Sequence, residues 1–104
     1  MNKVMIVQPM TGKTYEQLKT EWDKAYNELT DMGYRVANTR FRGLKPANHD
    51  AALYRLSEDY ATMSDSDGLL FLPGWREDIF CCIQRVTAEA FGKSVFDSTD
   101  ELRK

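Results

Sequence analysis

Short apolar runs alternate with amphipathic segments along this chain, and this order constrains the fold more than any other feature of the sequence. Four runs fit buried strands, at residues 3–9 (KVMIVQP), 34–41 (YRVANTRF), 68–74 (GLLFLPG) and 94–97 (SVFD). Between them, apolar residues recur at three- and four-residue spacing, which is typical of helices. Because a strand followed by a helix crosses over before it rejoins the sheet, the strands should be parallel. We predict a small three-layer α/β fold with about four strands and three main helices.

Capping residues indicate where the first two helices begin and end. Thr14 and Gln17 have the spacing of a capping box, and Gly33 suits the end of the helix that they begin. Asn48 or Asp50 can cap the second helix. The third helix covers the apolar pattern after residue 78 and closes at a glycine, residue 92.

Length, charge and hydropathy limit the kind of protein. A chain of 104 residues suits one domain, and we treat residues 1–104 as a single unit. The net charge of the chain is −2, so we do not expect the basic surface that binding to nucleic acid needs. The longest apolar run, GLLFLPGW, is far shorter than the ~18 residues of a membrane span, and no signal peptide precedes the first strand. We expect a cytoplasmic protein without nucleic-acid or membrane partners, whose polar tail, 99–104 (TDELRK), frays.

Cysteine and histidine give little support for a metal or a cofactor, and we expect neither. Cys81 and Cys82 are adjacent, so a disulfide between them would be strained, and both should be reduced. His49 is the single histidine, which leaves too few ligands for a zinc site. A helix N-terminus can activate a thiol, but the apolar neighbours Phe80 and Ile83 favour cysteines buried in the core.

Two loops are candidates for ligand binding, because ligands of open parallel sheets bind beyond the carboxyl ends of the strands. They are 8–14 (QPMTGKT) and 73–78 (PGWRED). The triplet GKT at 12–14 ends like a phosphate-binding loop, but Val7 stands where that motif needs its first glycine. The first loop is therefore either a tight turn capped by Thr14 or a backbone cradle for a ligand.

Several polar or aromatic residues near the second loop have a structural and a functional interpretation. Trp75 can be packed aromatic surface or a stacking platform. Glu77 and Asp78 begin the third helix, where carboxylates commonly act as caps. Asp67 begins the third strand, and by itself it is most simply a turn residue. Gln84 lies in the middle of the third helix, and by itself it indicates no function.

Four stretches taken together are more specific: PMTG after the first strand, GYRV at the end of the first helix, an aspartate opening the third strand, and LPGW at its end. In this order they resemble nucleoside 2-deoxyribosyltransferase-like proteins, and in particular a small branch from bacteria and phages, over roughly residues 3–97. The resemblance implies a flavodoxin-like (Rossmann-like) parallel sheet. It also implies a homo-oligomer in which a neighbouring subunit helps to close the site.

The resemblance implies a mechanism that this chain does not fully support. The enzymes of that superfamily attack C1′ of a deoxynucleoside with a glutamate and use aspartates on the base and sugar, and the aspartates match Asp67 and Asp78. The nucleophile position falls on Gln84, whose neutral amide cannot perform that step. Phe80 also stands where the family has a glycine, and Val7 and Gln8 stand where it has small residues that would let a ligand approach.

We therefore predict a protein that binds a nucleoside- or nucleotide-like small molecule. The catalytic positions of the family are Asp67, Asp78 and the substituted Gln84. The predicted ligand-binding residues are Gln8, Met10, Thr11, Gly12, Gly74, Trp75 and Glu77. Two alternatives stay open: a divergent N-glycosidase or deoxyribosyltransferase in which Asp78 or Glu77 compensates, and a phage or bacterial accessory protein that acts through protein contacts.

Overall fold

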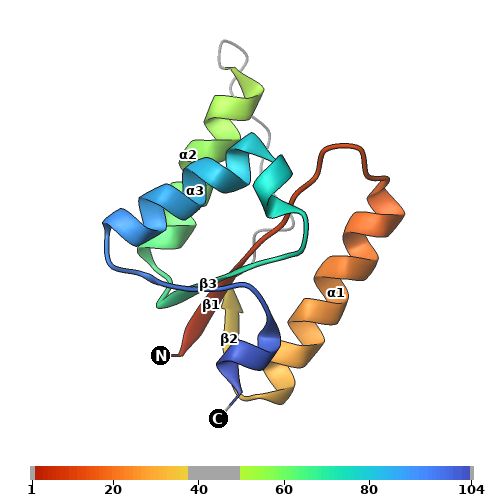
Figure 1. Cartoon of the computed structure of the whole chain (residues 1–104), viewed down its shortest axis with the longest axis vertical. Coiled ribbons are helices and arrows are strands. Elements are labelled where there is room, and N and C mark those ends of the chain that lie inside the picture. Colours follow the sequence, from red (N-terminus) through yellow and green to blue (C-terminus); the bar gives the residue numbers. More distant parts are fainter. Residues whose placement is uncertain (1, 38–49, 104) are drawn as a thin grey trace.

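A parallel sheet with helices on both faces forms the protein. The computed structural model describes residues 2–37 and 50–103. The four strands lie in the order β2-β1-β3-β4 and are β1 (Lys3–Val7), β2 (Arg35–Ala37), β3 (Gly68–Phe71) and β4 (Ser94–Phe96). Helix α1 (Tyr15–Asp31) covers one face, and α2 (Ala51–Ser64) and α3 (Ile79–Ala90) cover the other (Figure 1). The predicted three-layer α/β fold is confirmed, with all three strand pairs parallel.

Strand β1 divides the core into two apolar clusters because successive side chains of a strand point to opposite faces. Val4 and Ile6 pack with α1 in one cluster. Met5 and Val7 pack with α2 and α3 in the other. All four side chains are buried, as expected of a central strand that has helices on both faces.

The caps predicted from local sequence are present. The Gln17 N–H donates to Thr14 Oγ1 at 3.2 Å, and the Thr14 N–H donates to Gln17 Oε1 at 2.9 Å, which completes the capping box. Gly33 follows the last turn of α1 with a φ of +91°, a conformation that favours glycine. Asp50 caps α2, whereas the alternative cap Asn48 lies outside the described residues.

Three strands end before the predicted residue, and the last of them, β4, does so by one residue, at Phe96 instead of 97. β1 ends at Val7 instead of residue 9, and β3 ends at Phe71 instead of residue 74. Pro73 has no N–H for the sheet, and Gly74 turns the chain with a φ of +92°. The last part of the predicted second strand, 38–41, lies outside the described residues.

The C-terminal segment is ordered, so the predicted fraying of residues 99–103 is wrong. These residues include the short helix η2 (Thr99–Leu102). Leu102 is only 3% exposed and packs into the α1 cluster. Its carbonyl accepts the hydroxyl of Tyr34 at 3.1 Å, and Thr99 donates to Glu28 at 2.8 Å. One buried leucine and these two bonds anchor a segment whose composition is otherwise polar.

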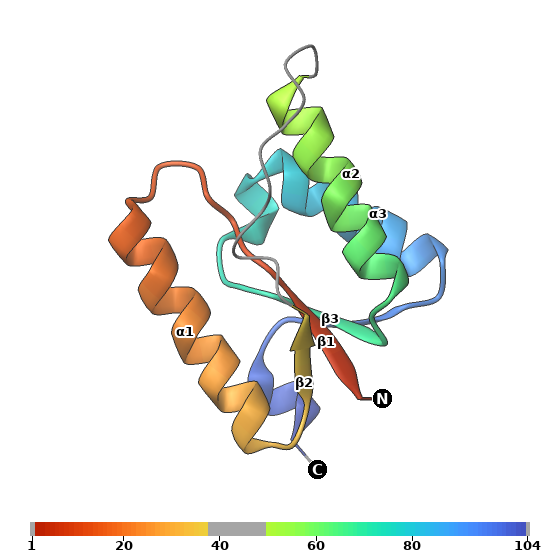
Figure 2. The ribbon, with the colours of Figure 1, turned by 180° about the vertical axis from the view of Figure 1, so that it is seen from behind.

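The strand order places a change of direction between β1 and β3. After β1 the chain crosses to α1 on one face, and after β3 it crosses to α3 on the opposite face (Figure 2). The carboxyl ends of these neighbouring strands therefore border a crevice, which is the usual ligand position in open parallel sheets. In the described part of the chain, the helices lack the combination of length and apolar character that a membrane span requires.

Candidate functional site

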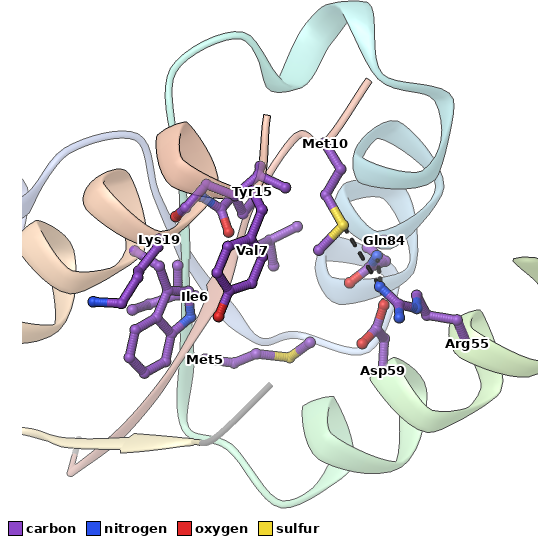
Figure 3. A pocket seen from close by; sticks show the side chains of 12 residues that line it. Met5, Ile6, Val7, Met10, Tyr15, Lys19, Arg55, Asp59 and Gln84 are labelled. Carbon is purple, nitrogen blue, oxygen red and sulfur yellow. Dashed lines mark hydrogen bonds between the residues drawn. The ribbon is translucent and has the colours of Figure 1, made fainter. Parts of the chain in front are cut away.

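Two adjoining cavities lie beyond the carboxyl half of β1, between α1 and the α2–α3 pair. Figure 3 shows side chains that line the first of them. Their volumes are about 250 and 300 Å³. Five residues line both cavities: Gln8, Met10, Arg55, Asp59 and Gln84. We call the two cavities together the switch-point hollow, because they lie where the strand order changes direction.

Asp78 fastens the loop after β1 to the start of α3. Its side chain is 6% exposed, and Oδ1 caps α3 by accepting the N–H groups of Phe80 at 3.0 Å and Cys81 at 3.2 Å. Oδ2 accepts the Met10 N–H at 3.1 Å and the Thr11 hydroxyl at 3.5 Å. Both oxygens of this carboxylate are therefore engaged in holding the wall of the hollow.

Gln84 is a buried amide in the middle of α3. It is 4% exposed, and its Nε2 donates to Asp59 Oδ2 on α2 at 3.3 Å. Its Oε1 is also buried and accepts no hydrogen bond from the residues that the structure describes. Buried polar atoms are nearly always hydrogen-bonded, so an unpaired oxygen on the wall of a cavity is where a ligand donor would bind.

Cationic and aromatic side chains stand around the same space. Arg55 lies one turn before Asp59 on α2, is exposed, and donates to Met10 Sδ at 3.6 Å. On the opposite wall, α1 contributes the exposed Tyr15 and also Lys19, which pairs with an aspartate at 2.9 Å (Figure 3). The hollow thus combines a buried amide and carboxylate with cations and an aromatic ring.

The structure brings five of the predicted site residues together: Gln8, Met10, Thr11, Asp78 and Gln84. Gln8 does not fill the hollow with its amide, because Nε2 is turned toward α1 and donates to the Leu18 carbonyl at 2.8 Å. Phe80 lines one cavity and stays 41% exposed. Gln8 and Phe80, two of the residues that replace small residues of the resembled family, therefore leave space between the helices.

Four other predicted residues, Gly12, Gly74, Trp75 and Glu77, line neither cavity. The Trp75 indole donates to Asp97 at 3.1 Å and contacts the guanidinium groups of Arg76 and Arg85 at 4.6 and 4.7 Å from its ring centre. Between the two interpretations of Trp75, the structure favours packed aromatic surface. Gly74 makes the turn that begins this segment.

Asp67 lies at the other end of the sheet from the hollow. Oδ2 accepts the N–H groups of Lys3 at 2.9 Å and Asn2 at 3.1 Å, and these bonds hold the pKa of Asp67 below its ordinary value. The carboxylate therefore joins the amino ends of β1 and β3. In a parallel sheet the amino and carboxyl ends of the strands lie at opposite ends of the sheet. Asp67 is therefore far from the hollow that Asp78 and Gln84 line.

The two cysteines differ in environment. Cys81 is 2% exposed, and burial together with the nearby charge of Asp78 raises the pKa of its thiol to about 12. Cys82 is partly exposed, and its thiol contacts the carbonyls of Trp75 and Arg76 at 3.6 and 3.4 Å. In the described ranges, histidine, cysteine and carboxylate side chains form no group of three or more that would hold a metal ion.

Sequence reasoning missed four residues with charged or hydroxyl-bearing side chains that line the hollow. They are Tyr15 and Lys19 on α1, and Arg55 and Asp59 on α2. Each pair is spaced by four residues, so its members share one side of their helix. The four-residue spacing can be recognised in the sequence. It does not predict which side of each helix faces the carboxyl ends of the strands.

Comparison with known families gives one assignment. The family described as a domain of unknown function, DUF4406, matches residues 2–97. Comparisons with curated proteins and with solved structures gave no match. The matched range contains every strand and all three main helices, together with all the residues of the hollow. The chain therefore belongs to the DUF4406 family.

Proposed function

We propose that this protein binds a nucleoside- or nucleotide-like small molecule in the switch-point hollow, as its resemblance to nucleoside 2-deoxyribosyltransferase-like proteins implies. The position of the hollow supports the proposal, since ligands of open parallel sheets bind at this point. The single observation that carries it is the Oε1 atom of Gln84, which is buried on the wall shared by both cavities and lacks a donor among residues 2–37 and 50–103.

The chemistry of the lining suits such a molecule. The Tyr15 and Trp22 rings and the Met10 thioether offer apolar surface to a base or the carbon skeleton of a sugar. Gln84 offers its Oε1 atom to a hydroxyl or N–H donor. Arg55 adds a cation that can meet an anionic group such as phosphate.

Binding is favoured over glycosidic cleavage by the state of the carboxylates. Gln84 is neutral, and each oxygen of Asp78 already accepts two hydrogen bonds. Glu77, the other acid considered as a replacement nucleophile, does not line the hollow. Asp59 does line it, but its Oδ2 accepts the Gln84 amide at 3.3 Å. Nucleophilic attack at a sugar carbon needs an available carboxylate in contact with the ligand.

We also propose that the chain forms a homo-oligomer through α3. Besides Phe80, which lines the hollow, three large apolar side chains on this helix are exposed: Ile79 by 66%, Ile83 by 36% and Val86 by 67%. Their spacing of four and then three residues places them along one side of the helix. Light scattering coupled to size-exclusion chromatography tests this: Val86→Glu should reduce the mass measured for the native protein, and a native monomer would refute the proposal.

Isothermal titration calorimetry tests the binding proposal. Nucleosides, nucleoside monophosphates and ADP-ribose are titrated into the native protein, Gln84→Leu and Glu89→Gln. Glu89 is an exposed residue on the same helix that lines neither cavity, so it serves as the control. At least one ligand should bind the native protein and Glu89→Gln but bind Gln84→Leu weakly. Uniform absence of heat and of thermal stabilisation would reject the proposal.

A further inference from the structure

We infer that Asp59 is a positioning residue that fixes the direction of the Gln84 amide, so that the hollow selects ligand groups that donate a hydrogen bond. This inference rests on the proposed function and deepens it, because it defines which chemical group the buried site accepts. The observation behind it is the contact between Gln84 Nε2 and Asp59 Oδ2, at 3.3 Å, on facing helices (Figure 3).

The hydrogen bonds that a neighbouring group can accept or donate determine which end of an amide, the NH₂ or the oxygen, faces that group. An ionised carboxylate only accepts hydrogen bonds, so it pairs with the NH₂ side of the Gln84 amide and not with its oxygen. Turning the amide over would bring Oε1 against the Asp59 carboxylate and oppose two acceptors. The observed direction therefore leaves Oε1 as the atom that is buried without a donor from the described part of the chain.

A ligand gains or loses affinity at this oxygen according to its own hydrogen-bonding groups. A hydroxyl or N–H group satisfies Oε1, whereas an ether oxygen or an unprotonated ring nitrogen opposes it and leaves two acceptors unpaired. In a nucleoside the donor comes from a sugar hydroxyl or from the base. Both sources present the same chemistry to Gln84, and methylated analogues separate them.

The burial of the pair strengthens this selection. Gln84 is 4% exposed and Asp59 is partly buried, so water competes little for Oε1. In such an environment a mismatched polar contact is penalised more than it would be at the surface. We expect about a tenfold difference in dissociation constant between a nucleoside and the analogue whose relevant donor is methylated.

The ligand experiment compares the native protein with Asp59→Asn and Glu58→Gln. The titrants are guanosine, its 2′-O-methyl and 3′-O-methyl derivatives, and N1-methylguanosine. Asparagine can accept or donate, so in Asp59→Asn the Gln84 amide is free to turn, and the preference for the donor should fall from about tenfold to less than about threefold. Glu58→Gln neighbours Asp59 but lines neither cavity, and it should keep the native preference.

A ligand-free experiment separates this inference from the proposed function. The side-chain NH₂ resonances of Gln84 are assigned by their loss in Gln84→Met and then compared between the native protein and Asp59→Asn. One of the two protons should move upfield in Asp59→Asn, because it loses a charge-assisted bond to a carboxylate. If Asp59→Asn does not fold, Asp59→Glu serves in its place and should keep both the NH₂ signal of the native protein and its ligand preference.

Each result decides something definite. Absence of binding by every nucleoside rejects the proposed function, while the Gln84 resonance still tests the amide direction. A resonance unchanged in Asp59→Asn overturns the positioning role. Equal affinity of the native protein for guanosine and for every methylated derivative, or a preference that survives in Asp59→Asn, overturns the selection of donors.

Discussion

The backbone N–H of Met10 donates to Asp78 Oδ2 at 3.1 Å, although the two residues are 68 positions apart in the sequence. The other oxygen of the same carboxylate caps α3. One buried side chain therefore joins the loop after β1 to the helix after β3, and these are the two segments that border the carboxyl ends of the central strands.

Replacement of Asp78 by alanine should destabilise the protein more than loss of an ordinary cap. The variant loses the cap of α3 and also leaves the Met10 N–H without its acceptor, so we expect a loss of about 2–4 kcal/mol in the free energy of unfolding. Urea denaturation measures it. The control is Asp50→Ala, which removes an exposed cap from α2 and should cost about 1 kcal/mol. Equal losses in the two variants would contradict the double role of Asp78.

Leu102 should contribute to stability as a core residue. It is 3% exposed among residues that pack on α1, so Leu102→Ala should lower the free energy of unfolding by about 2–5 kcal/mol. Leu53→Ala changes a leucine that is 65% exposed and should stay within about 0.5 kcal/mol of the native protein. A Leu102→Ala variant as stable as the control would mean that η2 does not dock in solution.

The adjacent cysteines should react at very different rates. The thiolate is the form that attacks iodoacetamide and displaces iodide. Cys81 is 2% exposed, and burial and Asp78 raise its pKa to about 12, whereas Cys82 is partly exposed. Mass spectrometry of the native protein at neutral pH should find the label on Cys82 well before Cys81. Urea should remove the difference, because unfolding exposes both thiols. Early labelling of Cys81 without urea would contradict its burial.

The ion pair between Arg85 and Asp97 should make stability depend on pH in the acid range. Its hydrogen bond, at 2.7 Å, is the main cause that lowers the pKa of Asp97 from the ordinary 3.8. Because the folded-state pKa is the lower one, the stabilisation is present above pH 3.8 and is lost as the pH falls through the folded-state value.

The Asp97→Asn variant tests this dependence. Its stability should be modestly lower than that of the native protein at neutral pH, because the pair is partly exposed, and the difference should shrink as the pH falls below 3.8. Urea unfolding followed by circular dichroism over this range provides the comparison. A difference that stays constant with pH would show that the charge of Asp97 is not its source.

Local signals predicted much of the fold and part of the hollow. The caps of α1 and α2 bind backbone groups no more than three residues away, so they could be predicted from neighbouring residues alone. They are Thr14 with Gln17, and Asp50. Met10 and Asp78 were predicted because they follow strands, and Gln84 because of its place in the resembled family. Trp75 follows a strand in the same way, but it packs beside Asp97. Position after a strand does not specify the direction of a side chain.

The sequence by itself determined the succession of strands and helices, their caps and the parallel arrangement, because these depend on periodicity and on contacts between near neighbours. Only the tertiary structure decided that Asp59 faces Gln84, that Asp67 lies at the opposite end of the sheet, and that Leu102 is buried. These relationships depend on how whole helices dock on the sheet. Docking is decided by the summed packing of many distant side chains, and no short stretch of sequence carries that information.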